Sequence, residues 1–222
     1  MGSLTADSSN VRALDEACDA ALRDGVAVLG LTNLGRQDVA GAVARRSSRV
    51  RHKTLTIRRE DKARPNTLSA RYGAEAFPLH TDSAYLAVPP RLVILCNFSD
   101  ERFSRPTLHC SIALLPGVVH AALKSSVWSV GNGTGIVLLS GFTNERSGPL
   151  YRYDDTFLIP ANAAAQICVA SLSSTTKHLV SAYEWSPRSA LILDNWRMLH
   201  GRGAGVDDTD FRRSLDRFEV WP

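Results

Sequence analysis

An apolar strand leads into a polar turn in the stretch Leu191-Ile192-Leu193-Asp194-Asn195-Trp196-Arg197-Met198-Leu199-His200-Gly201-Arg202. A second stretch, Phe77-Pro78-Leu79-His80-Thr81-Asp82, carries a histidine and a carboxylate two positions apart. Because alternate side chains of a strand leave the same face, His80 and Asp82 can point at one ion. Together with His200 at the end of the first stretch, they predict a metal site of two histidines and one aspartate.

The residue types favour iron over zinc at this site. Two imidazoles and one carboxylate leave open positions on Fe(II), which is the facial arrangement of non-haem iron oxygenases. The coordination of zinc is more often completed by further Cys or His ligands, and no cysteine lies near either stretch. The four cysteines are scattered, without a CxxC pair, as expected for free thiols in a reducing compartment.

Length and composition are those of one folded, soluble domain. The chain has 222 residues, 44% hydrophobic and 22% charged, with a formal charge of +4. This composition excludes a disordered or collagen-like chain, and no apolar stretch is long enough to span a bilayer. Residues 1–10 are polar, lack an apolar signal core and are expected to be flexible. Residues 11–222 are predicted to form a single domain in the cytoplasm.

The chain alternates a few helices with many short strands. Apolar residues three and four apart predict a helix over 11–24, and Gly25 should end it. A buried strand is expected at 26–31, a second helix at 37–46 and a further helical stretch at 161–183. Strand-like runs separated by Gly, Pro, Asn and Ser lie at 91–98, 107–115, 135–140, 151–153, 190–193 and 213–220. This pattern predicts a mostly β sandwich or barrel with flanking helices.

Three motifs in this order resemble the TauD/TfdA-like branch of the Fe(II)/2-oxoglutarate-dependent dioxygenases, which includes taurine dioxygenase, γ-butyrobetaine hydroxylase and clavaminate-synthase-like enzymes. They are Pro78–Asp82, Asp194–Arg202 and Arg212–Arg217, and the likeness covers roughly residues 20 to 220. The resemblance implies a double-stranded β-helix (jelly-roll, cupin-like) core. It also implies an enzyme that uses Fe(II), 2-oxoglutarate and O₂ to hydroxylate or desaturate an unactivated carbon, with release of succinate and CO₂.

The resemblance assigns roles to the residues around the metal. His80, Asp82 and His200 match the iron ligands, and the retained carboxylate of Asp82 favours hydroxylation or desaturation over halogenation. Arg213 matches the arginine that binds the distal carboxylate of 2-oxoglutarate, for which a guanidinium fork is suited. Its neighbour Arg212 should point to the opposite face of the strand. Thr107 stands where relatives hydrogen-bond the co-substrate, although Ser104-Arg105-Pro106-Thr107 departs from their Gly-Gly-Asp/Glu-Thr-like segment.

Two further positions suggest the substrate. Arg217 matches an arginine that binds an acidic group of the substrate in several relatives; the alternative is a salt bridge at the barrel rim. In Tyr151-Arg152-Tyr153-Asp154-Asp155, Asp154 or Asp155 could bind an amine or guanidine, or be a surface turn residue. Arg217 and Asp154 together favour a small-molecule substrate, an amino acid or a derivative of one, free or carrier-bound.

Asn195 and Trp196 flank the distal motif and are expected to orient His200, as partners of metal-bound histidines do, with core packing as the alternative for Trp196. The remaining histidines show no ligand spacing and are expected to be structural or exposed; they are His52, His109, His120 and His178.

A strongly basic stretch spans residues 45–64 and has no assigned chemistry. It is interpreted as a solvated face or an active-site loop. A nucleic-acid-binding barrel is an alternative, although few aromatic residues interleave with these charges. A cupin-like isomerase or sugar-binding protein with another metal is a further alternative.

Overall fold

The computed structural model describes residues 8–56, 68–131, 135–175, 178–205 and 213–222. Within these ranges the helices are α1 (Ser8–Asp24), α2 (Arg36–Arg46), α3 (Leu68–Tyr72), α4 (Gly117–Ser125) and α5 (Ala163–Thr175), with a short 3₁₀ helix at Ile112–Leu114. The first strands are β1 (Val26–Gly30), β2 (Val50–Thr56), β3 (Phe77–His80), β4 (Leu92–Asn97), β5 (Phe103–Ser111), β6 (Val127–Gly131) and β7 (Ile136–Ser140). They are followed by β8 (Phe142–Glu145), β9 (Gly148–Tyr151), β10 (Ile159–Pro160), β11 (Ser181–Trp185), β12 (Ser189–Asp194), β13 (Met198–Arg202) and β14 (Ser214–Val220). None of the helices in the described ranges is long and apolar enough to cross a membrane.

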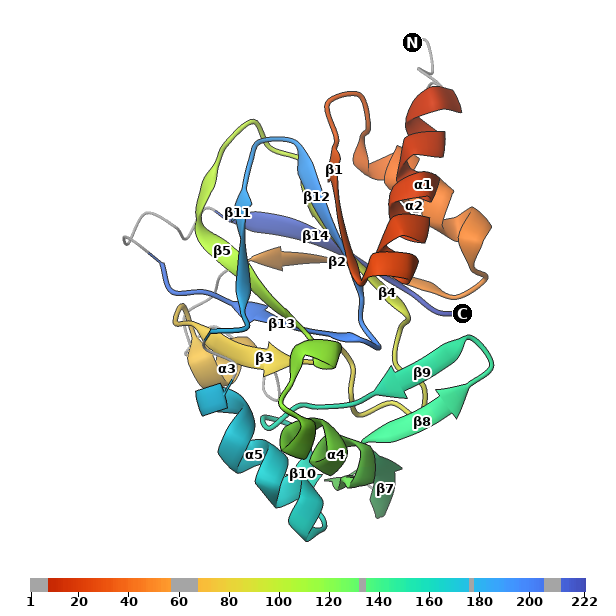
Figure 1. The fold of residues 1–222 in the computed structure, drawn as a ribbon. Coiled ribbons are helices and arrows are strands. Elements are labelled where there is room, and N and C mark those ends of the chain that lie inside the picture. Colours follow the sequence, from red (N-terminus) through yellow and green to blue (C-terminus); the bar gives the residue numbers. More distant parts are fainter. Residues whose placement is uncertain (1–7, 57–67, 132–134, 176–177, 206–212) are drawn as a thin grey trace.

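Two antiparallel sheets form the core (Figure 1). The five-stranded sheet has the order β1-β12-β4-β14-β2, and the four-stranded sheet has the order β11-β5-β13-β3. Smaller sheets, β10-β6-β7 and β8-β9, extend the molecule beside α4 and α5. Neighbours in the sheets are distant in sequence, as in a jelly roll, and the predicted fold class is confirmed.

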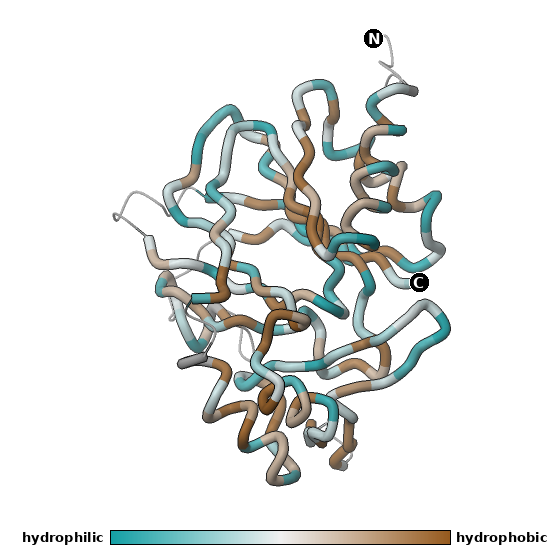
Figure 2. Tube along the Cα trace, in the orientation of Figure 1, coloured by the Kyte–Doolittle hydropathy of each residue, from teal (hydrophilic) through white to brown (hydrophobic). Residues whose placement is uncertain are grey.

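The alternation of side chains along β4 and β12 gives the five-stranded sheet two apolar faces. One set, including Ile94 and Ile192, packs against α1 and α2, which cover the outer face. The other set, including Leu95 and Leu191, packs against side chains of the four-stranded sheet, such as Trp185. Figure 2 shows the hydrophobic residues concentrated along these strands. Burial on both faces explains why the two strands are continuous apolar runs rather than alternating ones.

Several predicted elements are found close to their expected bounds. Helix α1 begins at Ser8, three residues before the predicted start, and ends where Gly25 takes a φ of +95°, which glycine adopts without strain. The helix predicted over 161–183 ends at Thr175, and β11 follows it, pairing with β5. The strand predicted over 151–153 is mostly wrong, since β9 ends at Tyr151.

The outer face of β14 carries a buried carboxylate whose ionisation stabilises the fold. Asp216 accepts two hydrogen bonds from Arg36, at 2.9 and 2.8 Å, and one from Thr54 at 2.9 Å, and it lies 2.6 Å from His52 Nε2. Burial by itself would raise the pKa of Asp216, but these partners together hold its pKa below the ordinary value.

We expect Asp216→Asn to lower the free energy of unfolding at pH 7 by about 2–3 kcal/mol, because charged hydrogen bonds are lost. A lowered pKa in the folded state gives stability that is present above the unfolded pKa and lost as the pH falls through the folded one. The difference between wild type and variant should therefore shrink below about pH 4. Urea unfolding at pH 7 and pH 3 measures it; a difference that is the same at both pH values would contradict this account.

Candidate metal centre and co-substrate pocket

Strand pairing brings the two histidines together. His80 is the last residue of β3, and His200 lies on β13 directly opposite it in the antiparallel register. The ring centroids are 4.8 Å apart. The strands approach closely here, because a Cβ on Gly201 would lie 2.7 Å from the carbonyl oxygen of Phe77 and 2.8 Å from that of Pro78. This close approach explains why glycine follows His200.

Asp82 completes the cluster. His80 Nε2 lies 3.5 Å from Asp82 Oδ1, and His200 Nε2 lies 3.4 Å from Asp82 Oδ2. One ligand atom from each of the three residues lies within 4.8 Å of the others, and all three side chains are buried. The structure therefore brings together the three residues that the sequence motifs singled out as metal ligands.

The protonation of the cluster suits a divalent cation. Burial would raise the pKa of Asp82, but Arg217 and the two histidines hold its pKa well below the ordinary value, so the carboxylate is ionised. Burial lowers the pKa of His200 and favours its neutral ring. The pKa of His80 is raised, because its interactions with Asp82 and other neighbours outweigh burial, so a cation would compete with a proton for its Nε2.

Two buried atoms indicate that a metal fits the cluster. Asp82 Oδ2 is buried and accepts no hydrogen bond among the described residues, although His200 Nε2 lies 3.4 Å away, and an unsatisfied carboxylate oxygen is costly. His80 Nδ1 lies 3.1 Å from the carbonyl oxygen of Pro78, a contact that requires a proton on Nδ1 and leaves a lone pair on Nε2. Asp82 Oδ2 and His80 Nε2 are the atoms that a metal ion would take as ligands.

Asn195 holds Asp82 rather than His200, so its predicted orienting role toward the histidine is wrong. Its side-chain oxygen accepts a hydrogen bond from the Asp82 backbone N–H at 2.8 Å, and its amide donates to the carbonyls of Asp82 and Pro90 at 3.1 and 2.9 Å. Trp196 is buried and donates to the carbonyl of Pro89 at 3.1 Å, with Arg91 stacked on its ring. Both residues fix the loop that carries the candidate aspartate ligand.

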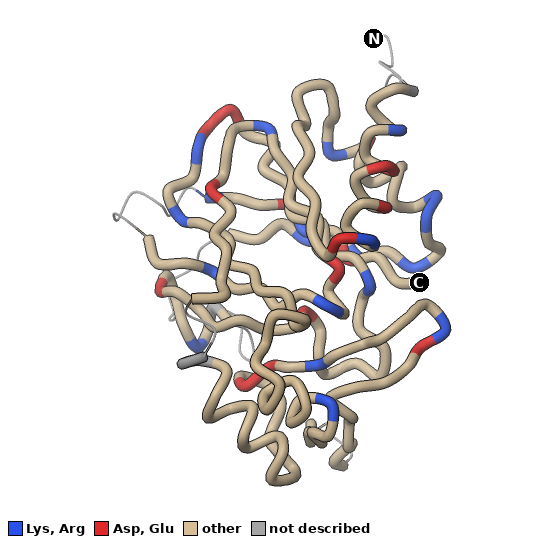
Figure 3. The backbone as a smooth tube through the Cα atoms, viewed as in Figure 1, with Lys and Arg blue, Asp and Glu red and all other residues tan. Residues whose placement is uncertain are grey.

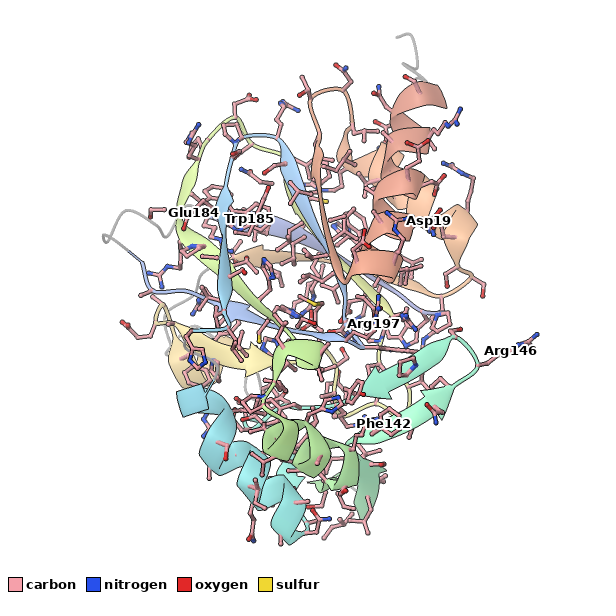
Figure 4. The ribbon with its side chains drawn as sticks, in the orientation of Figure 1. Asp19, Phe142, Arg146, Glu184, Trp185 and Arg197 are labelled. Atoms are coloured by element: carbon pink, nitrogen blue, oxygen red, sulfur yellow. The ribbon has the colours of Figure 1, made fainter. Side chains whose placement is uncertain are left out.

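The cluster opens into a cavity of about 650 Å³ whose lining includes Arg213 and Thr107. Arg213 Nη2 donates to Thr107 Oγ1 at 3.2 Å, and Trp185, labelled in Figure 4, donates its indole N–H to the same oxygen at 3.1 Å. Arg213 is buried. The two residues predicted to bind the co-substrate are thus adjacent in the pocket of the candidate metal cluster. Arg212 lies outside the described residues, so its predicted opposite orientation is not described.

Arg217 and Asp154 line the same cavity. Arg217 Nη1 forms a 2.7 Å ion pair with Asp82 Oδ1, so it is placed beside the cluster. Asp154 Oδ1 accepts the backbone N–H groups of Thr156 and Phe157 at 2.8 and 3.2 Å, and burial raises its pKa. Among the described residues, the cavity lining includes Asp154 but not Asp155, which separates the two candidates that the sequence left open.

The described part of the basic stretch is a helix end and an edge strand. Residues 45 and 46 end α2, and residues 50–56 form β2 beside β14, while residues 57–64 lie outside the described part of the chain. Arg51 and Lys53 of β2 line the cavity. In the view of Figure 3 the Lys and Arg residues are spread over several elements rather than gathered in one patch. In its described part the stretch is therefore a strand rather than the loop that the sequence suggested, and two of its cations line the cavity.

Three residues of the site were not predicted. Arg152 is buried and donates to the carbonyl of Ala87 at 2.9 Å and to those of Ala84 and Leu86, so it fixes the loop after Asp82. Ser83 lines the cavity and donates a hydrogen bond to Glu219 at 3.0 Å. Glu219 could have been found from the strand period, because Arg217 and Glu219 are two apart and share a face. Ser83 could not, because its backbone conformation, with a φ of +57°, follows no sequence pattern.

No family model matches the sequence. The fold is similar to that of solved iron oxygenases. One is asparagine oxygenase in complex with Fe(II), 2S,3S-3-hydroxyasparagine and succinate, with a TM-score of 0.65, 17% identity, and 97% of this chain and 80% of that chain covered. Another is the non-heme iron oxygenase OrfP with Fe, succinate and (3S)-hydroxy-L-Arg, with a TM-score of 0.66, 15% identity, and 97% and 81% covered.

PvcB from Pseudomonas aeruginosa gives a TM-score of 0.65 at 16% identity, covering 95% of this chain and 79% of that one. PvcB is described as an Fe, alpha-ketoglutarate dependent oxygenase from an isonitrile synthetic pathway. These likenesses establish that the chain has the fold of Fe/2-oxoglutarate-dependent oxygenases.

Proposed function

We propose that the protein is an Fe(II)- and 2-oxoglutarate-dependent oxygenase of the TauD/TfdA-like group that hydroxylates, or desaturates, an unactivated carbon of an amino acid or a derivative of one. The observation that carries this proposal is the buried His80–Asp82–His200 cluster, which shares one cavity with the Arg213–Thr107 pair. The fold shared with asparagine oxygenase and OrfP, whose complexes hold succinate and hydroxylated amino acids, supports it.

Each group of the pocket has a role in the proposed reaction. His80, Asp82 and His200 would hold Fe(II), which supplies the activation of O₂ and the oxidising power while 2-oxoglutarate is converted to succinate and CO₂. Arg213 binds the distal carboxylate of 2-oxoglutarate through its guanidinium fork, and Thr107 steadies that guanidinium. Apolar side chains of the lining, including Phe77, Phe157 and Leu215, exclude water from the reacting carbon.

The charges of the pocket support an amino-acid-like substrate. Arg217 provides a cation for a carboxylate, and Asp154 provides an anion for an amine or guanidine, and both line one cavity. The one remaining oxygen of Asp154 is available for this contact, since Oδ1 is occupied by two backbone N–H groups. We further propose that residues 11–222 act as one domain and that the protein works in the cytoplasm.

Turnover of 2-oxoglutarate by the purified protein tests the proposal. With Fe(II), ascorbate, O₂ and a panel of L-amino acids, we expect succinate and CO₂ in equal amounts, and a substrate product heavier by one oxygen or lighter by two hydrogens. Zn²⁺ should not replace Fe(II). Activity with Zn²⁺ and no consumption of 2-oxoglutarate would point instead to a cupin-like isomerase and overturn the proposal.

We expect Asp154→Asn to raise the KM for the amino-acid substrate by about tenfold or more, because a charged hydrogen bond is replaced by a neutral one. The KM for 2-oxoglutarate should change little. Asp155→Asn is the matched control: it alters the adjacent carboxylate, which is not among the described lining residues, and should leave both values near wild type. Equal effects of the two variants would contradict the role of Asp154.

A further inference from the structure

A buried carboxylate that is not a candidate ligand lies beside the metal cluster. Glu219, on β14, has a side chain only 1% exposed. Arg51, on the edge strand β2, binds it with two guanidinium nitrogens: Nη2 lies 2.7 Å from Oε1, and Nε contacts Oε2. A buried carboxylate requires such a partner, because taking an isolated charge out of water is costly. The pair is therefore a fixed ionic element, and its Arg51 lines the cavity.

This ion pair holds the residue that follows Asp82. Ser83 Oγ donates to Glu219 Oε1 at 3.0 Å and accepts a hydrogen bond from Arg51 Nη2 at 2.7 Å. Ser83 has a φ of +57°, in the left-handed region that is unfavourable for a residue with a side chain. A strained residue persists only when its surroundings hold it in place. Here the two charged side chains hold it, directly beside a candidate ligand.

Glu219 also shares a guanidinium with Asp82. Arg217 Nη1 is 2.7 Å from Asp82 Oδ1, and Arg217 Nη2 is 3.6 Å from Glu219 Oε1. If Glu219 lost its charge, Arg217 would interact with Asp82 alone and would compete more strongly with a cation for that carboxylate. Glu219 thus reaches Asp82 by two routes, through the backbone of Ser83 and through Arg217.

We propose that Glu219, with Arg51 as its counter-ion, is a positioning residue that sets the orientation and availability of Asp82 for the metal. The proposal rests on the proposed function only in taking the His80–Asp82–His200 cluster as a metal site. It also gives a role to Arg51, one of the cations in the basic stretch that the sequence left without a function.

Binding of Mn²⁺ alone, measured by titration under argon without 2-oxoglutarate or substrate, tests the proposal. Glu219→Gln should raise the Kd for Mn²⁺ by about tenfold or more, the range found when residues that orient metal ligands are changed. Ser83→Ala should weaken binding in the same direction. The Glu219→Gln/Ser83→Ala double variant should raise the Kd for Mn²⁺ by less than the product of the two single fold-changes, because both residues act through one network.

Asp216→Asn is the matched control. Asp216 is also a buried carboxylate of β14 paired with an arginine, but it lies on the outer face of the sheet. It should keep wild-type Mn²⁺ affinity in the folded protein, although it is less stable. An equal loss of affinity in Asp216→Asn, or wild-type affinity in folded Glu219→Gln, would overturn the proposal. Ser83→Ala decides the question if Glu219→Gln does not fold.

His80→Ala separates this inference from the proposed function. If His80→Ala loses Mn²⁺ binding while Glu219→Gln keeps it, the cluster is a metal site and only the positioning role is overturned. If His80→Ala binds Mn²⁺ as the wild type does, the cluster is not the metal site, and both proposals are overturned.

Discussion

His200→Ala is expected to abolish metal binding at the cluster and, with it, the turnover of 2-oxoglutarate. Replacing a residue that only supports a metal ligand costs about 10- to 100-fold in metal affinity, so removing a ligand should cost more than about 100-fold. The other two candidate ligands, His80 and Asp82, would remain in place. Two protein ligands are one fewer than the three that a facial iron site uses. Mn²⁺ titration and succinate formation measure the two losses separately.

The fold should survive this change, which makes the result interpretable. His200 Nδ1 has no hydrogen-bond partner among the described residues, and His200 Nε2 lies 3.4 Å from Asp82, whose charge stays paired with Arg217 when the ring is removed. His120→Ala is the matched control, because His120 contacts Tyr151 at 3.1 Å and is not among the described lining residues of the cavity. It should keep metal binding and turnover. Succinate formation by His200→Ala at the wild-type rate would exclude the cluster as the reaction centre.

The jelly-roll core was predictable because its strands are strongly patterned. The apolar runs of β4 and β12 and the strand β14 appear in the sequence close to their observed bounds. Strand β2 was missed because its charged residues hide the period, and β3, which the sequence placed only as the strand that ends near His80, is short and contains a proline. The predicted helix was wrong over the first residues of β11, because an Ala-rich segment precedes this strand. The pairing of β11 with the distant β5 cannot be seen in the local sequence.

The metal cluster was predictable and its surroundings were not, for a physical reason. His80 ends β3 and Asp82 follows it two residues later, so their relation is local, and the distal motif supplied His200. By contrast, the contact of Asn195 with Asp82 depends on a turn that packs across the sheet, and the contact of Arg51 with Glu219 depends on the register of β2 and β14. Such pairings are set by tertiary packing and cannot be found from periodicity alone.

Two arginines of the cavity lining have different partners. Arg213 and Thr107 lie in contact with each other in one part of the lining, while Arg217 pairs with Asp82 beside the cluster. Arg213 directly precedes β14 and Arg217 lies on that strand, four residues later. The proposed function assigns Arg213 to the co-substrate and Arg217 to the surroundings of the metal and the substrate. Substitutions at the two positions should therefore affect different kinetic constants.

Arg213→Met is expected to raise the KM for 2-oxoglutarate by about 100-fold. A hydrogen bond to a charged group contributes about 1.5–3 kcal/mol, and each 1.4 kcal/mol is a factor of ten in affinity, so losing a two-pronged contact gives this magnitude. Arg213→Lys should recover only part of the loss, because an ammonium cannot bind a carboxylate with two parallel N–H groups. Thr107→Val removes only a supporting hydroxyl and should have a smaller effect, of about fivefold.

A shorter co-substrate shows whether the loss belongs to the distal carboxylate. 2-Oxobutyrate keeps the 2-oxo-carboxylate end but lacks the distal carboxylate, so its binding should be weak in the wild type and unchanged in Arg213→Met. Arg36→Met, which breaks an ion pair with Asp216 on the outer face of the sheet, is the control for the loss of an arginine elsewhere. If Arg213→Met weakened both co-substrates equally, Arg213 would act on the fold of the pocket and not on the carboxylate, because only a contact with that group can distinguish the two acids.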